Sequence, residues 1–281
     1  MILKIKRVRE EDKYVYTIIA KIAKPCPSDS NPSSNLKLDS GSFYLPKKSR
    51  GDDAHFVSHT HQTVGVADGV GGWSKIGVDA GNFARELMMN AHGEVESSEV
   101  VDPRKVLNEA FLKTKAEGSS TACVLTLKDS SLIAVNVGDS GFMVLREKKL
   151  MYRSPPQQHR FNYPYQLGKS EKSDRPQSAL HIEVGVMAGD VVIVGTDGLW
   201  DNIHPTQIEY ILMRAGDDES CCAPKEIAER IGAVAFFNSR NKDYDSPFAI
   251  ASRKAGRNHK GGKKDDITVL VAFVKSSVSH P

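Results

Sequence analysis

Aspartates stand at the ends of several apolar stretches of this sequence. The stretches "TVGVADG", "NVGDSG" and "GTDGLWDN" end their apolar runs at Asp68, Asp139 and Asp197, each with a glycine within two residues. A fourth stretch, "KKDDITVLVAF", reverses the order and places Asp265 before the run. A single Asp-Gly pair after a strand is ordinary turn chemistry. Its repetition indicates that several carboxylates share one place.

The reversed order of the fourth stretch indicates where these carboxylates would meet. If its strand runs antiparallel to its neighbours, a carboxylate at its start lies at the same sheet edge as carboxylates at their ends. Carboxylates held a few ångströms apart repel one another and raise each other's pKa, so such a cluster requires cations. The acids that we expect in the cluster are Asp53, Asp68, Asp139, Asp197 and Asp265.

The ligand types predict which cations would bind. These motifs offer oxygen ligands and neither histidine nor cysteine, which selects hard ions such as Mg²⁺ or Mn²⁺ over zinc or copper. A glycine beside each acid lets the backbone come close, and the carbonyl of Gly69 can serve as an extra ligand. Two such ions activate a water at neutral pH and clamp a phosphoryl group. The reaction class that follows is hydrolysis of a phosphate ester.

The strands and helices that must position these acids are expected in alternating groups along the chain. Two or three strands are followed by two helices, then by more strands, two more helices and a closing strand. This order is not the regular alternation of a parallel sheet, and it predicts an α+β fold of antiparallel sheets covered by helices. Asp102 and Pro103 form a cap and first-turn pair for the second helix. The helices are expected at residues 80–95, 102–117, 205–216 and 222–240, and a long irregular connection at residues 154–177.

Composition restricts the class of protein further. The chain has 281 residues, 40% of them hydrophobic, and a net charge of +3, so no global field points to nucleic acid or a membrane surface. Its four cysteines have neither the spacing of a zinc site nor the density of a disulfide scaffold, which favours a reducing, intracellular compartment. No apolar stretch approaches the roughly 20 residues that span a bilayer.

The N-terminal part is expected to be separate from the main domain. Residues 25–35 are rich in Pro, Ser and Asn, which is typical of a linker. We therefore expect an N-terminal segment and linker at residues 1–35 and one domain at residues 36–281. The first residues do not resemble a secretory signal or an organelle-targeting peptide, because acids occur too early.

Six motifs in order carry a resemblance to a known family. The stretches "GDDAHF", "VADGVGGW", "GSSTACVL", "NVGDSGF", "GTDGLWDN" and "GGKKDDITVLVAFV" resemble the metal-dependent protein phosphatases of type 2C, and most closely the plant-type branch related to mitochondrial and plastid members. The resemblance covers roughly residues 38 to 275. It implies a four-layer α-β-β-α sandwich, in which two antiparallel sheets are flanked by helices and carry a binuclear metal centre at one end.

The resemblance also implies roles for individual residues. Asp68 would bridge two Mg²⁺ or Mn²⁺ ions, and Asp197 and Asp265 would complete the catalytic set with the Gly69 carbonyl. Asp52 and Asp53 would hold metal-bound waters. Asp139 matches the acid associated with a third ion, Asp266 would lie behind the ligands, and Arg50 is our choice for the substrate phosphate, with Lys47 and Lys48 as alternatives.

Two positions depart from the family pattern. Many members carry a histidine two residues after the bridging aspartate, a candidate general acid, whereas this chain has Val70. Leaving-group protonation would then come from water or another side chain. The arginine that commonly follows the "GDS" motif is replaced by Gly141.

The expected function is hydrolysis of phosphoserine and phosphothreonine in proteins. The departures leave open a pseudophosphatase, which binds a phosphorylated partner without turning it over, and a phosphatase for a small metabolite is the third possibility. We expect a monomer whose partner is a phosphorylated protein, not nucleic acid or a membrane. Cytoplasm or nucleus is the default location, and the relatives make mitochondrion or plastid the alternative.

Overall fold

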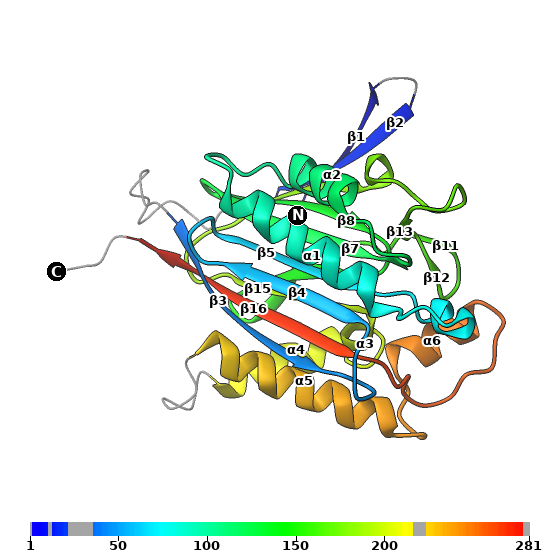
Figure 1. The fold of residues 1–281 in the computed structure, drawn as a ribbon. Coiled ribbons are helices and arrows are strands. Elements are labelled where there is room, and N and C mark those ends of the chain that lie inside the picture. Colours follow the sequence, from blue (N-terminus) through cyan, green and yellow to red (C-terminus); the bar gives the residue numbers. More distant parts are fainter. Residues whose placement is uncertain (1, 11–12, 22–35, 216–222, 278–281) are drawn as a thin grey trace.

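The computed structural model describes residues 2–10, 13–21, 36–215 and 223–277. Two main sheets and several helices make up this part of the chain (Figure 1). This confirms the expected combination of helices with two mainly antiparallel sheets. The linker predicted at residues 25–35 lies outside the described residues.

The larger sheet has seven strands and the smaller has five. In the larger sheet the spatial order is β1 (Ile2–Glu10), β2 (Lys13–Lys21), β14 (Leu180–Gly185), β8 (Ser131–Val137), β7 (Ala122–Lys128), β5 (Thr63–Asp68) and β4 (Asp53–Ser58). In the smaller sheet it is β10 (Lys149–Arg153), β9 (Gly141–Arg146), β15 (Val191–Gly195), β16 (Ile267–Ser276) and β3 (Leu36–Leu45).

One strand pair corrects the expectation of purely antiparallel sheets. Strand β2 pairs with β14 in parallel, with Thr17 opposite His181, whereas the other neighbours in both main sheets are antiparallel. The larger sheet is therefore mixed. The pairing also attaches the β1–β2 hairpin to the sheet, so part of residues 1–35 continues the fold, while the boundary at Leu36 stays a prediction.

Apolar side chains fill the space between the two sheets and the space under the helices. Val66 and Leu125 of the larger sheet belong to the same buried cluster as Val144 and Leu270 of the smaller one. Helices α1 (Gly81–Glu96) and α2 (Pro103–Lys113) bury their apolar faces on the larger sheet. Helices α4 (Pro205–Ala215) and α5 (Pro224–Arg240) do the same on the smaller sheet (Figure 1).

Helix boundaries follow local signals. Asp102 caps α2 by accepting a hydrogen bond from the Arg104 amide at 2.9 Å, and Pro103 occupies the first turn, as the sequence predicts. The sequence analysis missed α3 (Asp197–Trp200), α6 (Pro247–Lys254) and the 3₁₀ helix η1 (Gly71–Ile76). These are short, and a few residues give too little periodicity to detect.

The connection predicted at residues 154–177 is not wholly irregular. It contains β11 (Gln158–Arg160), β12 (Tyr163–Pro164), β13 (Leu167–Gly168) and the 3₁₀ helix η2 (Pro176–Ser178). Strands β11 and β12 form a small hairpin, and β13 pairs with β6 (Ser119–Ser120). The connection is therefore fixed against the main body.

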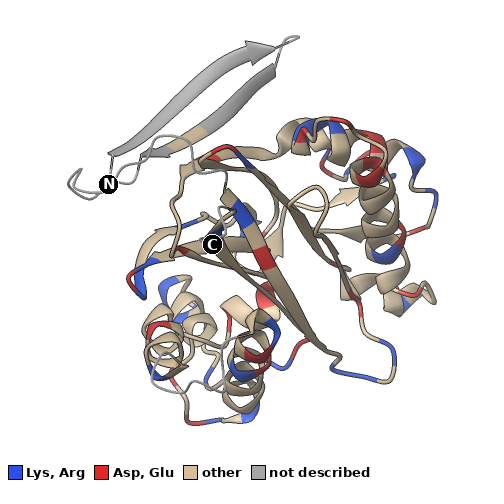
Figure 2. Cartoon of the chain, turned by 90° about the vertical axis from the view of Figure 1, so that its left-hand side faces the viewer, with Lys and Arg blue, Asp and Glu red and all other residues tan. Residues whose placement is uncertain are grey.

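The surface carries both signs of charge. Figure 2 shows Lys and Arg interspersed with Asp and Glu on the helices, in keeping with the small net charge of the sequence. Of the helices that the structure describes, none has the length and apolar character needed to cross a membrane.

Candidate active site

Two strands of the larger sheet bring the first pair of acids together. Asp53 begins β4 and Asp68 ends β5, and the two residues are opposite each other in the antiparallel register. Asp53 is buried, and its carboxylate accepts hydrogen bonds from Thr268 Oγ1 at 2.6 Å and Thr196 Oγ1 at 2.7 Å. Those threonines belong to the smaller sheet and the turn after β15, so Asp53 joins the two sheets.

The smaller sheet supplies the other acids from the same edge. Strand β15 runs antiparallel to β16, with Gly195 opposite Val269. Asp197 follows the end of β15, and Asp265 precedes the start of β16. The reversed order in the sequence therefore does place carboxylates from both strands at one edge.

The pKa values reflect this crowding. Burial and neighbouring negative charge raise the pKa of Asp68 well above its usual range; the neighbours, in decreasing order of effect, are Asp197, Asp53, Asp265 and Asp139. Burial raises the pKa of Asp53 to about 8, against the opposing effect of its threonine hydrogen bonds. Burial, followed by the charge of Asp197, raises the pKa of Asp139 to about 6. The five acids named from the sequence thus interact electrostatically.

Two lysines place positive charge inside this cluster. The Lys263 ammonium contacts the carboxylate of Asp197 and lies 2.8 Å from Asp201 Oδ2 and 3.5 Å from Asp265 Oδ2. The Lys47 ammonium lies 2.6 Å from Asp265 Oδ1. Although burial raises the pKa of Asp197, the Lys263 charge outweighs it and the pKa is lowered. Of the five acids named from the sequence, Asp197 is the one whose pKa is lowered.

Asp52 and Asp266 are two further buried acids at the start of β4. Asp52 is 1% exposed, and its Oδ1 lies 2.9 Å from the Lys48 ammonium. Asp266 is equally buried, and its carboxylate accepts hydrogen bonds from the backbone amides of Asp52 and Asp53. Asp266 thereby fixes the start of β4, and with it the two acids there.

The carboxylates retain unused acceptor capacity. Asp139 Oδ2 accepts a hydrogen bond from Gln158 Nε2 at 2.8 Å, whereas Asp139 Oδ1 is buried without a hydrogen-bond partner among the described residues. Asp197 Oδ1 is also buried without a hydrogen-bond partner among the described residues. Buried carboxylate oxygens without protein donors suit a hard cation, because such ions take oxygen ligands. The donor set therefore fits Mg²⁺ or Mn²⁺.

Lysine side chains compensate part of the negative charge of the cluster. Within the described ranges, no group of three or more His, Cys, Asp or Glu side chains has the geometry of a metal site. Lys263 contacts Asp197, Asp201 and Asp265, and Lys47 contacts Asp265, so ammonium groups take positions between the carboxylates. Ligation of a metal by these acids would require these lysines to move.

Two glycines permit the close approach of backbone that the sequence analysis expected. A Cβ atom on Gly69 would collide with the carbonyl oxygen of Ala80. A Cβ atom on Gly198 would collide with the carbonyl oxygen of Asp266 and lie 3.3 Å from Asp265 Cβ. Glycine at these positions therefore lets β5 and the turn after β15 pack directly against neighbouring backbone.

Arg50 and Val70, also named from the sequence, have contacts outside the five-acid cluster. Arg50 is 68% exposed, and its guanidinium lies 3.0 Å from Asp79 Oδ2, a carboxylate that also pairs with Arg85. Val70 follows Gly69 and precedes η1, with its amide bonded to the Ser119 carbonyl. The role of Arg50 in phosphate binding stays a prediction, because its side chain is engaged by Asp79.

Sequence reasoning missed some residues of this site. Asp201 lies one turn of α3 after Asp197, and this four-residue spacing was a usable signal. Burial raises the pKa of Asp201 to about 7, against the lowering effect of Lys263. Lys47 was named from the sequence only as an alternative for the substrate phosphate, and Lys263 was not named. The contacts of Lys47 with Asp265 and of Lys263 with Asp197 and Asp201 join segments that are remote in sequence, so no local signal predicts them.

Solved structures share this fold. The photosystem II phosphatase PBCP superposes with a TM-score of 0.79 at 32% identity, over 85% of this chain and 99% of that one. The catalytic domain of the serine threonine protein phosphatase PstP, in complex with two manganese ions, superposes with a TM-score of 0.60 at 18% identity, over 86% of this chain and 100% of that one. The second likeness shows the fold alone.

Curated relatives define the family. The probable protein phosphatase 2C 80 of Arabidopsis thaliana is 44% identical over 261 residues, which are 89% of this chain and 62% of that protein. The protein phosphatase PTC7 homolog fig of Drosophila mojavensis is 40% identical over 243 residues, which are 80% of this chain and 78% of that protein. The fold is that of the phosphatase domains with which the structure superposes. The chain belongs to the protein phosphatase 2C family, which confirms the resemblance found in the sequence.

This chain corresponds to only part of several relatives. The chain spans 62%, 53% and 34% of the length of three curated Arabidopsis relatives. A scan against protein-family models gave no match.

Proposed function

We propose that this chain hydrolyses phosphoserine and phosphothreonine in proteins, in a metal-dependent reaction. The observation that carries the proposal is the convergence of Asp68, Asp197 and Asp265 from both sheets at one edge, in a chain of the protein phosphatase 2C family. A buried group of carboxylates with unused oxygens is unfavourable in itself and suits the binding of cations. Named protein phosphatases among the relatives support a protein substrate.

The residues that would hold two Mg²⁺ or Mn²⁺ ions follow from this arrangement. Asp68 interacts electrostatically with acids of both sheets, and the resemblance to the family assigns it to the metal ligands, together with Asp197, Asp265 and the Gly69 carbonyl. Asp52 and Asp53 would hold water in place, and Asp139 would serve a third ion. Bound ions of this kind activate water and neutralise charge on the transferred phosphoryl group.

The remaining side chains hold this set in position. Thr268 and Thr196 donate hydrogen bonds to the Asp53 carboxylate, and Asp266 accepts the backbone amides at the start of β4. These bonds limit the freedom of Asp52 and Asp53 before substrate binds. Val70 cannot donate a proton, so the leaving alkoxide receives its proton from water or from another side chain.

The same features support further parts of the proposal. Helices cover the outer faces of both sheets, which supports a four-layer α-β-β-α sandwich as the architecture. We place the phosphatase domain at residues 36–281 and propose that it acts as an intracellular monomer, in the cytoplasm or nucleus or in an organelle.

A comparison of three substrates distinguishes the proposed reaction from its two alternatives. Para-nitrophenyl phosphate, a phosphothreonine peptide and a phosphorylated sugar are offered to the full chain with Mn²⁺, with Mg²⁺ or with a chelator. We expect metal-dependent turnover of the first two and a higher kcat/KM for the peptide than for the sugar phosphate. Preference for the sugar phosphate would support the metabolite phosphatase. A folded, metal-binding protein that turns over none of the three would support the pseudophosphatase.

A further inference from the structure

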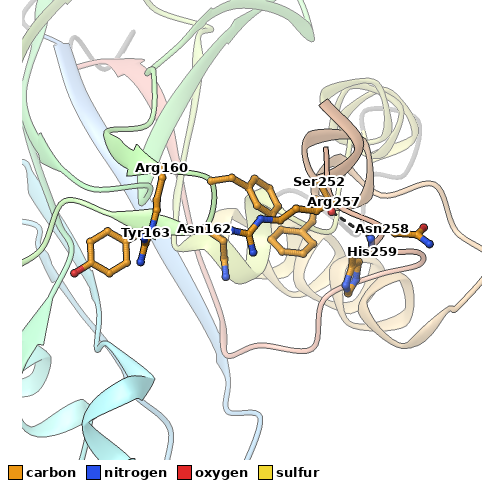
Figure 3. Close-up of a pocket in the computed structure, with 9 residues that line it drawn as sticks. Arg160, Asn162, Tyr163, Ser252, Arg257, Asn258 and His259 are labelled. Carbon is orange, nitrogen blue, oxygen red and sulfur yellow. Dashed lines mark hydrogen bonds between the residues drawn. The ribbon is translucent and has the colours of Figure 1, made fainter. Parts of the chain in front are cut away.

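A cationic pocket lies beside the acid cluster. Its volume is about 530 Å³, and it is bounded by the β11–β12 hairpin on one side and by α6 and the turn after it on the other (Figure 3). Arg160 and Tyr163 come from the hairpin, and Ser252, Arg257 and His259 from the second side. Its lining includes two arginines and no carboxylate.

Both arginines are held on fixed turns. Arg160 is paired with Tyr163 across the hairpin, whose turn contains Asn162 in the left-handed region at a φ of 55°. Gly256, at a φ of 70°, ends α6, and the Arg257 amide then bonds to the Ser252 carbonyl at 2.9 Å. The backbone positions of the two arginines are thus defined by local structure.

Their guanidinium groups are supported by aromatic rings and not by acids. The Arg160 guanidinium lies 4.7 Å from the centre of the Tyr163 ring, and that of Arg257 lies 5.8 Å from the centre of the Phe161 ring. Neither group has a carboxylate partner among the described residues. A ring contacts the face of a guanidinium and leaves its N–H groups at the edge free to bind an anion.

The pocket is connected to the candidate active site at two points. Phe248 lines the pocket; its amide donates to the Asp201 carbonyl at 3.1 Å, and its ring centre lies 5.1 Å from the Lys263 ammonium. Gln158, two residues before Arg160, donates to the Asp139 carboxylate. A peptide whose phosphorylated residue is at the acid cluster therefore has neighbouring residues within reach of the pocket.

We propose that Arg160 and Arg257 form a subsite for a second anionic residue of the substrate, either an acidic side chain or a second phosphorylated residue. This inference rests on the proposed function and specifies the substrate class: acidic or multiply phosphorylated segments of proteins. Two guanidinium groups suit the planar oxygens of a carboxylate and the tetrahedral oxygens of a phosphate alike. The subsite is exposed to solvent, so it contributes selectivity that added salt weakens.

Kinetics on matched peptides tests the subsite. A phosphothreonine peptide with neutral neighbours is compared with versions that carry glutamate or phosphoserine at successive positions on either side. We expect wild type to favour an anionic version by about fivefold to tenfold in kcat/KM, and Arg160→Gln/Arg257→Gln to lose that preference. The control is Lys37→Gln/Lys128→Gln, which removes the same charge at exposed sites at the far ends of β3 and β7.

The outcomes separate the subsite from the catalytic assignment. Para-nitrophenyl phosphate is too small to reach the pocket, so its turnover should be equal in wild type and both double variants. An unchanged anionic preference in Arg160→Gln/Arg257→Gln, or no preference in wild type, overturns the subsite. If wild type hydrolyses nothing, the proposed function fails, and fluorescence anisotropy of the labelled peptides then decides: tighter binding of the anionic version to wild type than to the double variant supports the subsite, and equal binding overturns it.

Discussion

The Lys263 ammonium lies 2.8 Å from the carboxylate of Asp201 and also contacts that of Asp197, so one lysine bridges two acids on successive turns of the chain. The lysine side chain is 18% exposed. Because the surrounding acids would otherwise repel one another, this lysine stabilises the cluster in the absence of metal. The same position makes it a competitor for any cation that uses Asp197.

Substitution Lys263→Met should have opposite effects on stability and on metal binding. Removing one partner of a largely buried ion pair leaves an uncompensated charge, so the chelator-treated protein should lose about 3 kcal/mol of unfolding free energy. The apparent Kd for Mn²⁺ should fall by about tenfold, because the competing ammonium is gone. Thermal unfolding and calorimetric titration measure the two quantities. Lys264→Met, at the exposed neighbouring lysine, is the matched control, and an equal effect of both changes would contradict the account.

The raised pKa values of the cluster predict how stability depends on pH. Asp53 has its pKa raised from 3.8 to about 8, so the folded state binds its proton more tightly than the unfolded state. The metal-free protein should therefore become less stable as pH rises between about 4 and about 8. The effect of Asp139, whose pKa is raised to about 6, has the same sign.

Metal should reverse this trend. Cations bind the deprotonated carboxylates, so Mn²⁺ affinity should increase with pH over the same interval and binding should release protons. Unfolding temperatures measured across the pH range, with chelator and with Mn²⁺, give the test. Parallel curves under the two conditions would show that these acids are not the metal ligands.

The hydroxyl of Thr268 should matter more than its methyl group. Its Oγ1 donates to the buried Asp53 carboxylate at 2.6 Å, and Thr268→Val keeps the shape but removes the donor. We expect a loss of about 2 kcal/mol in unfolding free energy and weaker Mn²⁺ binding, since a hydrogen bond to a buried charged group is lost. Thr268→Ser retains the hydroxyl and should stay close to wild type. Chemical denaturation of both variants with Mn²⁺ present provides the comparison, and equal losses would argue for simple packing.

The close approach of Gly198 to neighbouring backbone predicts that a larger residue there lowers both stability and activity. An alanine Cβ there would collide with the carbonyl oxygen of Asp266 and displace the start of β16. Gly198→Ala should destabilise the fold by about 3 kcal/mol and reduce metal-dependent turnover, because Asp265 moves with the strand. Gly72→Ala is the control, since the nearest neighbour of its Cβ would be Val70 Cγ1 at 3.9 Å. A Gly198→Ala enzyme as stable and active as Gly72→Ala would contradict the described packing.

Much of the site could be predicted because its residues lie at the ends of strong apolar strands. Asp68 and Asp197 follow such strands and Asp265 precedes one, so strand direction alone brings them to one edge. The contacts of Lys263 could not be predicted, because its partner Asp201 is 62 residues away in sequence and no local pattern links them. The hydrogen bond from Thr268 to Asp53 could not be predicted either, because these residues are also remote in sequence.

In the fold, too, features with a local sequence signal could be predicted, whereas pairings between remote segments could not. Helix α2 was predictable because Asp102 supplies a cap and Pro103 a first-turn residue next to a clear apolar period. The parallel pairing of β2 with β14 was not, since it joins segments about 160 residues apart that carry no mutual signal. Short helix α6, which forms one wall of the cationic pocket, has too few turns for its period to be detected.

The central claim is that Asp68, at the junction of the two sheets, holds the metal ions of a protein phosphatase. The most direct measurement is hydrolysis of a phosphothreonine peptide by wild type and Asp68→Asn at matched folded concentration, each with Mn²⁺ or with chelator. We predict turnover in wild type with Mn²⁺ only, and background rates for Asp68→Asn in both conditions, together with weakened Mn²⁺ binding in calorimetry. Metal-dependent turnover by Asp68→Asn at the wild-type rate would contradict the account.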